Sequence, residues 1–310
     1  MTEGVTNHMQ KDTIVLDREA AERVQALLEM GFGRLNITDG ADAMMEGVFA
    51  YGDPSYKPEV SYGVRDNIGR LIMHQPQKMG RSIARDHSDW KVSFNKGIPL
   101  DLDIRVASGE TSVNLSEAHL TALASKVGSG KFATTLTGTM DSLAHVVMKT
   151  ASGRTHAVLN GTFPKLENYS VSSASGIVTT ALGGTFSELG TLDVRTASGT
   201  VDLGLAGAYP ALRRITIDTV SGAGDLNLVD AAFSDLTLAL NCVSGAHVIR
   251  CPCDVGVGLH FKSLTGQIDA PALHRVKGMF VNDLYGDAET TLEISISSVS
   301  GRVSVQLSEA

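Results

Sequence analysis

Hydrophobic and polar residues alternate along most of this chain, in short runs that return at a regular interval. Within a run, apolar residues stand two apart with polar residues between them, which is the period of a strand with one buried face. The runs come in pairs around a recurrent Ser-Gly, as at residues 191–197 and 200–205 around Ser198 and Gly199. Each repeat therefore predicts two short strands that meet at a glycine corner.

The repeat has a fixed length over the middle of the chain. From Gly130 to Gly245 the Ser-Gly glycines follow one another every 23 residues. A constant period in this range indicates stacked structural units. Coiling such units stacks each strand on its counterpart at about 4.8 Å, and a right-handed coil is the expected sense. The predicted fold class is all-β, a right-handed parallel β-helix (solenoid) with ~23-residue turns and a looped N-terminal cap region.

The Ser-Gly corners form two columns, and we interpret both as structural. Glycine suits a corner that requires a positive φ or a close approach of two backbones. A nucleophilic serine needs one base beside it, whereas this serine recurs in every repeat, so we expect its hydroxyls to bond to one another and to corner amides. The serines are Ser108, Ser129, Ser152, Ser175, Ser198, Ser221 and Ser244, and the glycines are Gly109, Gly130, Gly153, Gly176, Gly199, Gly222 and Gly245.

The N-terminal third carries the same signature at wider spacing, with 36 residues from Gly33 to Gly69 and 40 from Gly69 to Gly109. We interpret these as wide turns with loops at residues 53–58 and 75–89, while residues 17–30 fit either a short helix or a strand. The predicted organisation is a disordered tail at 1–12, wide turns and a cap at 13–100, and a regular β-helix at 101–310 that continues the N-terminal part.

Composition narrows the classes of partner. The net charge is −8 and aromatic residues make up 5% of the chain, without a basic stripe, so nucleic acid is disfavoured. No apolar run approaches the length of a membrane span, and residues 1–12 lack the pattern of a secretory signal. We therefore expect a cytoplasmic protein, or one associated with a membrane or envelope through a partner.

The outward positions offer a few candidates for binding or catalysis. Three residues after the corner glycine stand His156, Asp202 and Asp225, and the two aspartates fall on adjacent turns. Carboxylates about 5 Å apart suit a retaining glycosidase or a Ca²⁺ site. Arg195 belongs to a basic ladder four residues before the glycine. The ladder reads Arg105, Lys126, Lys149, Ser172, Arg195 and Asp218.

The outward faces as a whole favour a surface without catalysis, because they carry mainly Ser, Thr, Ala, Asn and Gly. The chain contains three cysteines, Cys242, Cys251 and Cys253, and their spacing is not that of the usual zinc ligands. We expect buried free thiols, no metal and no cofactor.

The chain resembles the toast-rack, putative-adhesin family of bacterial proteins. The resemblance rests on the repeated pattern Val-x-Thr-Ala-Ser-Gly-x-Val-x-Leu, as at residues 194–203. It also rests on N-terminal blocks at residues 29–37, 45–51, 57–62 and 69–76. This resemblance implies a β-helical domain without known catalysis. Some relatives are attached to membrane helices and act in cell-envelope stress sensing, whereas others are described as adhesins.

The leading hypothesis is a non-enzymatic scaffold or protein-interaction module, linked to envelope stress or adhesion. The first alternative is a β-helix that binds or processes carbohydrate. The second is self-assembly, suggested by the strand pattern at residues 292–307, which runs almost to the C-terminus. An uncovered terminal strand would recruit another chain.

Overall fold

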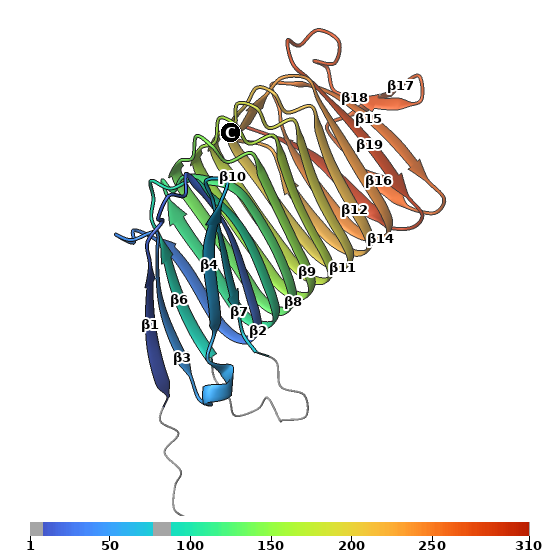
Figure 1. Cartoon of the computed structure of the whole chain (residues 1–310). Coiled ribbons are helices and arrows are strands. Elements are labelled where there is room, and N and C mark those ends of the chain that lie inside the picture. Colours follow the sequence, from blue (N-terminus) through green and yellow to red (C-terminus); the bar gives the residue numbers. More distant parts are fainter. Residues whose placement is uncertain (1–8, 77–87, 310) are drawn as a thin grey trace, which may run out of the picture.

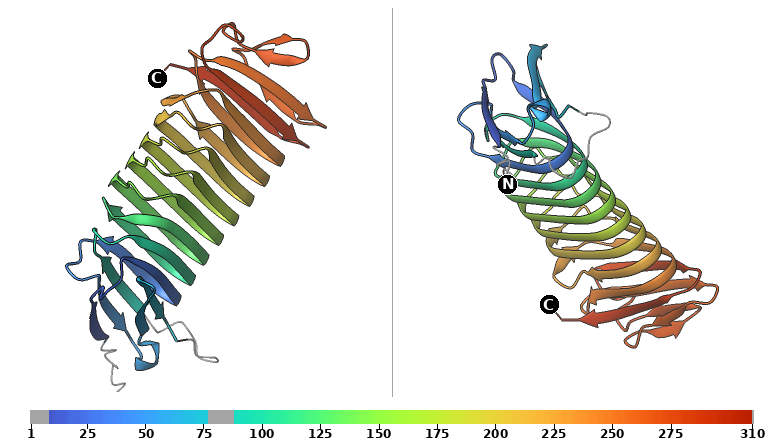
Figure 2. Two further views of the ribbon diagram at one scale, coloured as in Figure 1. Left: turned by 45° about the horizontal axis from the view of Figure 1, so that its top comes forward. Right: turned by 90° about the horizontal axis from the view of Figure 1, so that it is seen from below.

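The computed structural model describes residues 9–76 and 88–309 (Figures 1 and 2). These residues form an elongated stack of strands joined in one continuous sheet. The single helical element among them is a 3-10 turn, η1 (Pro54–Tyr56), inside the loop predicted at residues 53–58. The all-β prediction is therefore confirmed.

The centre of the stack is a parallel β-helix in which each turn pairs with the next. Partner residues lie one repeat apart, so that Ser175 pairs with Ser198 and Gly176 with Gly199. Each element passes through its Ser-Gly corner and holds both predicted strands. The turns are β7 (Leu100–Ser116), β8 (Leu120–Thr139), β9 (His145–Thr162), β10 (Asn168–Thr185), β11 (Thr191–Tyr209), β12 (Arg214–Asn227) and β14 (Leu236–Pro252).

The corner glycines are required for both reasons that the sequence suggested. Gly176 has φ +132°, and a Cβ placed on it would stand 1.9 Å from the carbonyl oxygen of Gly153 in the preceding turn. Residues other than glycine rarely adopt such a φ. Successive turns can therefore meet at this corner only through glycine.

The core consists of like residues stacked in columns inside the coil. Leu192, Val194, Leu203 and Leu205 are buried in β11, as the alternation predicts. At the opposite corner the rings of Phe163, Phe186 and Tyr209 stack with centroids 5.0 Å apart at each step. The core is thus continuous along the coil.

At the N-terminal end the order of turns differs from the order in the chain. The strand β2 (Arg23–Asp39) pairs with β7 on one side and with β5 (Ile68–His74) and β6 (Ser88–Phe94) on the other. Gly33 pairs with Gly109 and is a corner, as predicted. Gly69 is not a corner, because it lies inside β5 and pairs with Val24. Three antiparallel strands complete this end, β1 (Gln10–Leu16), β3 (Met45–Tyr51) and β4 (Glu59–Arg65).

The C-terminal end repeats this arrangement. The last strands, β19 (Thr291–Ser298) and β20 (Arg302–Ser308), lie between β14 and the earlier strands β15 (Gly256–Ser263) and β16 (Gln267–Asp269). The expectation that the C-terminal strand is an open edge is wrong for its first three residues, which pair with β14 on one side and β16 on the other, whereas residues 305–308 pair with β14 alone. The short strands β13 (Ala231–Phe233), β17 (His274–Val276) and β18 (Met279–Val281) complete the fold, and β17 and β18 form the hairpin at the end of the stack in Figure 1.

Several local expectations also change. Residues 10–12, assigned to a disordered tail, begin β1, and most of residues 17–30 form strand β2. Most of the loop predicted at 75–89 lies outside the described residues. Cys242 and Cys251 are buried and free as expected, whereas the free Cys253 is exposed. Among the described residues, no helix has the length and apolar character needed to cross a membrane.

Candidate functional site

The predicted acidic pair does form, but one of its two members is already engaged in an ion pair. Asp202 on β11 and Asp225 on β12 are register partners on adjacent turns. Asp225 also makes an ion pair with Arg250, which comes from the next turn, β14. His156 lies two turns from Asp202, with Thr179 between them. A shared site for these three residues would therefore need to span several turns.

Arg195 lies on the other side of the corner from this group. Its Nε stands 3.3 Å from Oδ2 of Asp218 on the next turn, and Asp218 accepts a hydrogen bond from Asn241. The four candidates do not converge on one point. Among the described residues, no group of three or more histidines, cysteines or acids is placed to hold a metal ion.

The Ser-Gly column lies in register along the coil, as Ser152, Ser175 and Ser198 illustrate. Polar side chains from inside the coil support these corners. The hydroxyls of Ser173 and Thr196 donate to the carbonyls of Ser175 and Ser198, each at 3.2 Å. The arrangement fits a structural role, with these inner hydroxyls bonding to the corner backbone.

A groove runs along the coil just before this column, and we call it the corner groove. It is lined by the residues two, three and four positions before each corner glycine. Its first part crosses β2, β7, β8, β9 and β10 and has a volume of about 670 Å³. Its second part continues over β10, β11, β12, β14 and β19 with about 490 Å³. Both parts share Ser172 and Ser173, so the groove crosses most of the stack.

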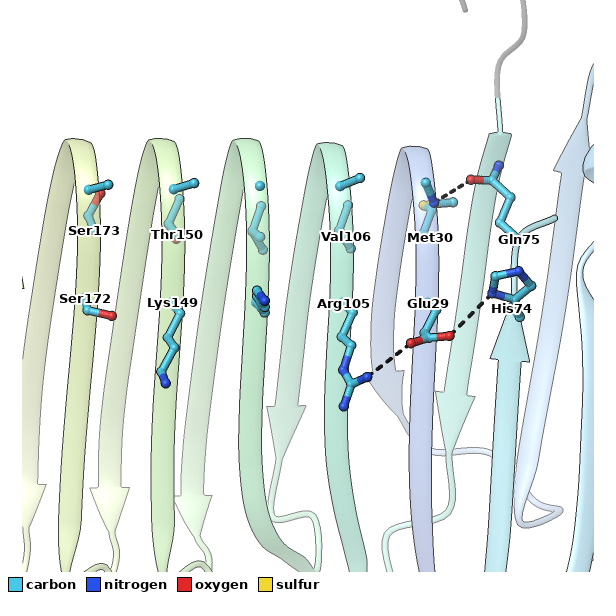
Figure 3. A pocket seen from close by; sticks show the side chains of 17 residues that line it. Glu29, Met30, His74, Gln75, Arg105, Val106, Lys149, Thr150, Ser172 and Ser173 are labelled. Atoms are coloured by element: carbon cyan, nitrogen blue, oxygen red, sulfur yellow. Dashed lines mark hydrogen bonds and ion pairs between the residues drawn. The ribbon is translucent and has the colours of Figure 1, made fainter. Parts of the chain in front are cut away.

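One wall of the corner groove is the basic ladder, now extended at its N-terminal end. His74 and Glu29 precede Arg105 in register (Figure 3). Glu29 contacts His74 Nδ1 at 3.4 Å and Arg105 Nη1 at 3.3 Å, and Asp103 accepts from Arg105 Nη2 at 2.7 Å. The hydrogen bond to Asp103 and the charge of Asp103, and to a smaller extent the charge of Glu29, raise the pKa of Arg105. Arg105 is therefore held in place and partly neutralised.

Lys126 and Lys149 occupy the next two turns of the same wall. They are register partners, and both side chains are exposed. Neither makes an ion pair or a side-chain hydrogen bond with another residue in the described part of the chain. Like charges directly opposite each other in a sheet destabilise it. This pair is thus an uncompensated positive feature on a protein of net charge −8.

The facing wall changes character along the groove. Over the N-terminal turns it consists of glycine and alanine, which leave the groove open. Over the C-terminal turns it becomes an exposed apolar ridge. The small residues are Gly31, Ala107, Gly128, Ala151, Ala174 and Ala197, and the ridge is Val220, Val243 and Val299, which are 53%, 46% and 46% exposed.

The sequence predicted the basic ladder but not the groove beside it. The ladder residues share a register position, so their spacing along the sequence was enough to predict the ladder. The concavity depends on how the backbone bends between the ladder and the corner. The run of Gly and Ala two positions before the corner was a usable signal, because a small side chain at a repeated outward position leaves room beside the backbone.

Comparison with known proteins supports the toast-rack resemblance. A family model described as the N-terminal domain of toast_rack, DUF2154, matches residues 5–156. No curated protein matches the chain.

Solved structures similar to this chain have low identity. One is a "putative lipid binding protein" from Parabacteroides distasonis (12% identity, 97% of each chain covered, TM-score 0.44). Another is a "putative adhesin" from Parabacteroides merdae (10%, 97% of each chain, 0.41). A third is a "putative cell adhesion protein" from Clostridium sporogenes (15%, 97% of this chain and 100% of that one, 0.32).

Proposed function

This chain belongs to the toast-rack family through its N-terminal domain, and we propose that it is a non-enzymatic protein-interaction module. The proposed binding surface is the corner groove, which would hold an extended segment of a partner protein. Adhesion, which the names of similar solved structures mention, would be one use of such a surface.

The observation that carries this proposal is the continuity of the corner groove. Its two parts meet at Ser172 and Ser173 and together cross nine strands. A site for a small ligand is usually a single enclosed cleft. An open groove that repeats the same geometry at each turn suits a chain that runs along the coil, as in other solenoids with extended binding surfaces.

The outward acids favour this reading over carbohydrate processing. A glycosidase needs two free carboxyl groups that flank the scissile bond. Asp225 is occupied by Arg250, and Asp218 by Arg195 and Asn241. We therefore propose that these acids stabilise the sheet surface rather than act on a substrate.

The proposal can be tested by filling the groove. Ala151 and Ala174 are exposed on its small-residue wall, and the pair A151W/A174W would obstruct it. The matched control is A181W/A206W, which places the same rings on exposed positions after the corner. Random peptides displayed on phage would be selected on the wild-type chain and then tested on both variants, once circular dichroism shows that both are folded.

We expect the selected peptides to lose binding to A151W/A174W and to keep binding to A181W/A206W. Peptides that bind all three proteins equally would place the interaction outside the groove. Failure to select any binder to the folded wild-type chain would also count against the proposal.

A further inference from the structure

We propose that the partner segment is acidic where it crosses the N-terminal part of the corner groove and apolar where it crosses the C-terminal part. This inference rests on the proposed function and specifies the chemistry of its partner. The occupant is a peptide segment of another protein, with its acids beside Arg105, Lys126 and Lys149 and its apolar side chains against the valine ridge.

The acidic part of the prediction follows from uncompensated charge. Three cations stand on consecutive turns, which are about 4.8 Å apart. Arg105 is balanced by Glu29 and Asp103, but Lys126 and Lys149 have no partner among the described residues. Two adjacent lysines with free ammonium groups are a favourable place for carboxylates, since each new ion pair also relieves their mutual repulsion.

The extent of the positive wall sets the length of the acidic part. The ladder runs from Arg105, which pairs with Glu29 and Asp103, to Arg195, which pairs with Asp218, and its uncompensated charge is that of Lys126 and Lys149. Four steps between turns cover about 19 Å, which an extended peptide spans with five to six residues at roughly 3.4 Å each. Side chains on one side of such a peptide recur about every 6.7 Å. The lysine side chains have flexible four-carbon stems, which can bridge the difference between the spacing of about 6.7 Å for the peptide's side chains and about 4.8 Å for the turns.

The apolar part follows from the ridge that replaces the alanine wall. Val220, Val243 and Val299 are about half exposed on consecutive turns, and each lines the second part of the groove. Burying such side chains gives about 25 cal/mol per Å² of apolar surface. The charged wall here is weaker, because Arg195 and Asp218 pair with each other. Apolar side chains of the partner are therefore favoured over this stretch.

The groove suits a peptide better than a sugar polymer or a membrane. Its N-terminal part exposes alanine, glycine and backbone, and Gln75, which closes that end, already bonds to the amides of Gly31 and Phe32 (Figure 3). Sugar hydroxyls that face the wall of alanine and glycine would find no polar side chain on that side, and burying an unpaired hydroxyl is costly. A flat membrane surface would reach the lysine tips and leave the concave floor unfilled.

The experiment uses the full chain and two synthetic peptides, measured by fluorescence anisotropy. The first is a dye-labelled segment of about twelve residues, the length that covers both parts of the groove, with three glutamates followed by three leucines. The second replaces the glutamates with glutamines. The protein variants are K126Q/K149Q and a control, K165Q/R214Q, which removes two exposed cations outside the groove. Thermal melting would first show that both variants fold like the wild type.

We expect K126Q/K149Q to weaken binding of the glutamate peptide about tenfold, from two exposed ion pairs, while the control changes it less than twofold. The glutamine peptide should bind the wild type about tenfold more weakly, and added salt should reduce the difference. Equal affinity for both peptides, or an unchanged K126Q/K149Q, would overturn the inference.

Other occupants give other outcomes. Lysine-dependent binding of polygalacturonate or of phosphatidylserine vesicles, without binding of the peptide, would overturn the inference in favour of a sugar or a membrane. Self-association abolished by K126Q/K149Q would indicate a second copy of the chain. If neutral peptides selected by display bind in the groove and the glutamate peptide does not, the proposed function stands and the inference fails. If nothing binds in the groove, both fail.

Discussion

The replacement of Gly176 by alanine tests the physical basis of the whole coil. Gly176 is the corner of β10, with φ +132° and the corner of β9 directly beneath it. The new Cβ would stand 1.9 Å from Gly153 O, closer than the 3.0 Å below which real Cβ atoms essentially never lie. Either the two turns separate locally by about 1 Å, or the corner changes its backbone conformation. Both responses disturb the parallel pairing between β9 and β10.

The cost can be estimated from the two contributions. A residue with a Cβ in a left-handed conformation costs roughly 1–2 kcal/mol. Separating the turns weakens one or two backbone hydrogen bonds at about 1 kcal/mol each. The expected destabilisation is therefore about 3 kcal/mol. With an unfolding entropy of about 2.1 cal/mol/K per residue over the 310 residues, this lowers Tm by about 5 °C if the chain unfolds as one unit.

Gly204→Ala is the matched control, because Gly204 lies in β11 with nothing within 4 Å of its added Cβ. Its Tm should stay unchanged or rise slightly, since alanine restricts the unfolded chain. Thermal melting followed by circular dichroism gives both values. Hydrogen exchange then shows whether the loss is local to β9 and β10, which a repeat protein allows. Equal Tm values and equal exchange in G176A and G204A would refute the steric argument.

Three further outcomes are expected from the interior of the coil. Phe186→Ala removes the middle ring of the aromatic stack and should destabilise the protein by about 3–5 kcal/mol in denaturant titrations, whereas a cost below about 1 kcal/mol would mean that the stack relaxes. Burial lowers the pKa of His247 below its ordinary 6.5, so the unfolded chain binds a proton that the folded chain does not, and stability is full above pH 6.5 and falls below it. The Tm should accordingly drop from pH 7 to pH 5 with a smaller slope in H247V, and parallel slopes would contradict this. A thiol reagent should label Cys253 alone in the native protein, because Cys242 and Cys251 are buried and burial raises the pKa of the Cys251 thiol to about 12. Mass spectrometry counts the labels. More than one label before unfolding would show that the coil opens.

The regular part of the fold could be predicted because each interior column constrains the sequence directly. Val194, for example, lies between its register partners Val171 and Ile217 on the adjacent turns, and all three are buried, so this position demands an apolar side chain on each of these turns. The corner demands glycine for backbone reasons that no other residue meets. These two requirements fix the period, the strand positions and the parallel pairing.

The ends could not be predicted in the same way, because spacing along the chain does not say which turn lies beside which. Gly69 follows the glycine pattern, yet β5 meets β2 with Gly69 opposite Val24. What decides the order is the packing of whole strands, which a local pattern does not record. The candidate site was limited for a similar reason: the ladder follows from register, whereas the groove follows from the shape of the backbone.

The order of turns at the C-terminus bears on self-assembly. The pattern at residues 292–307 suggested a free terminal strand, but β19 and β20 lie inside the sheet and their partners are the outermost strands. Of these, β16 is only three residues long, and β18 pairs with part of β15 in the antiparallel sense. Short and partly covered strands are the usual protection against edge pairing. These features favour assembly through a face such as the corner groove, where the lysine pair and the valine ridge lie exposed, over assembly through the end of the coil, where residues 305–308 of β20 keep one unpaired side.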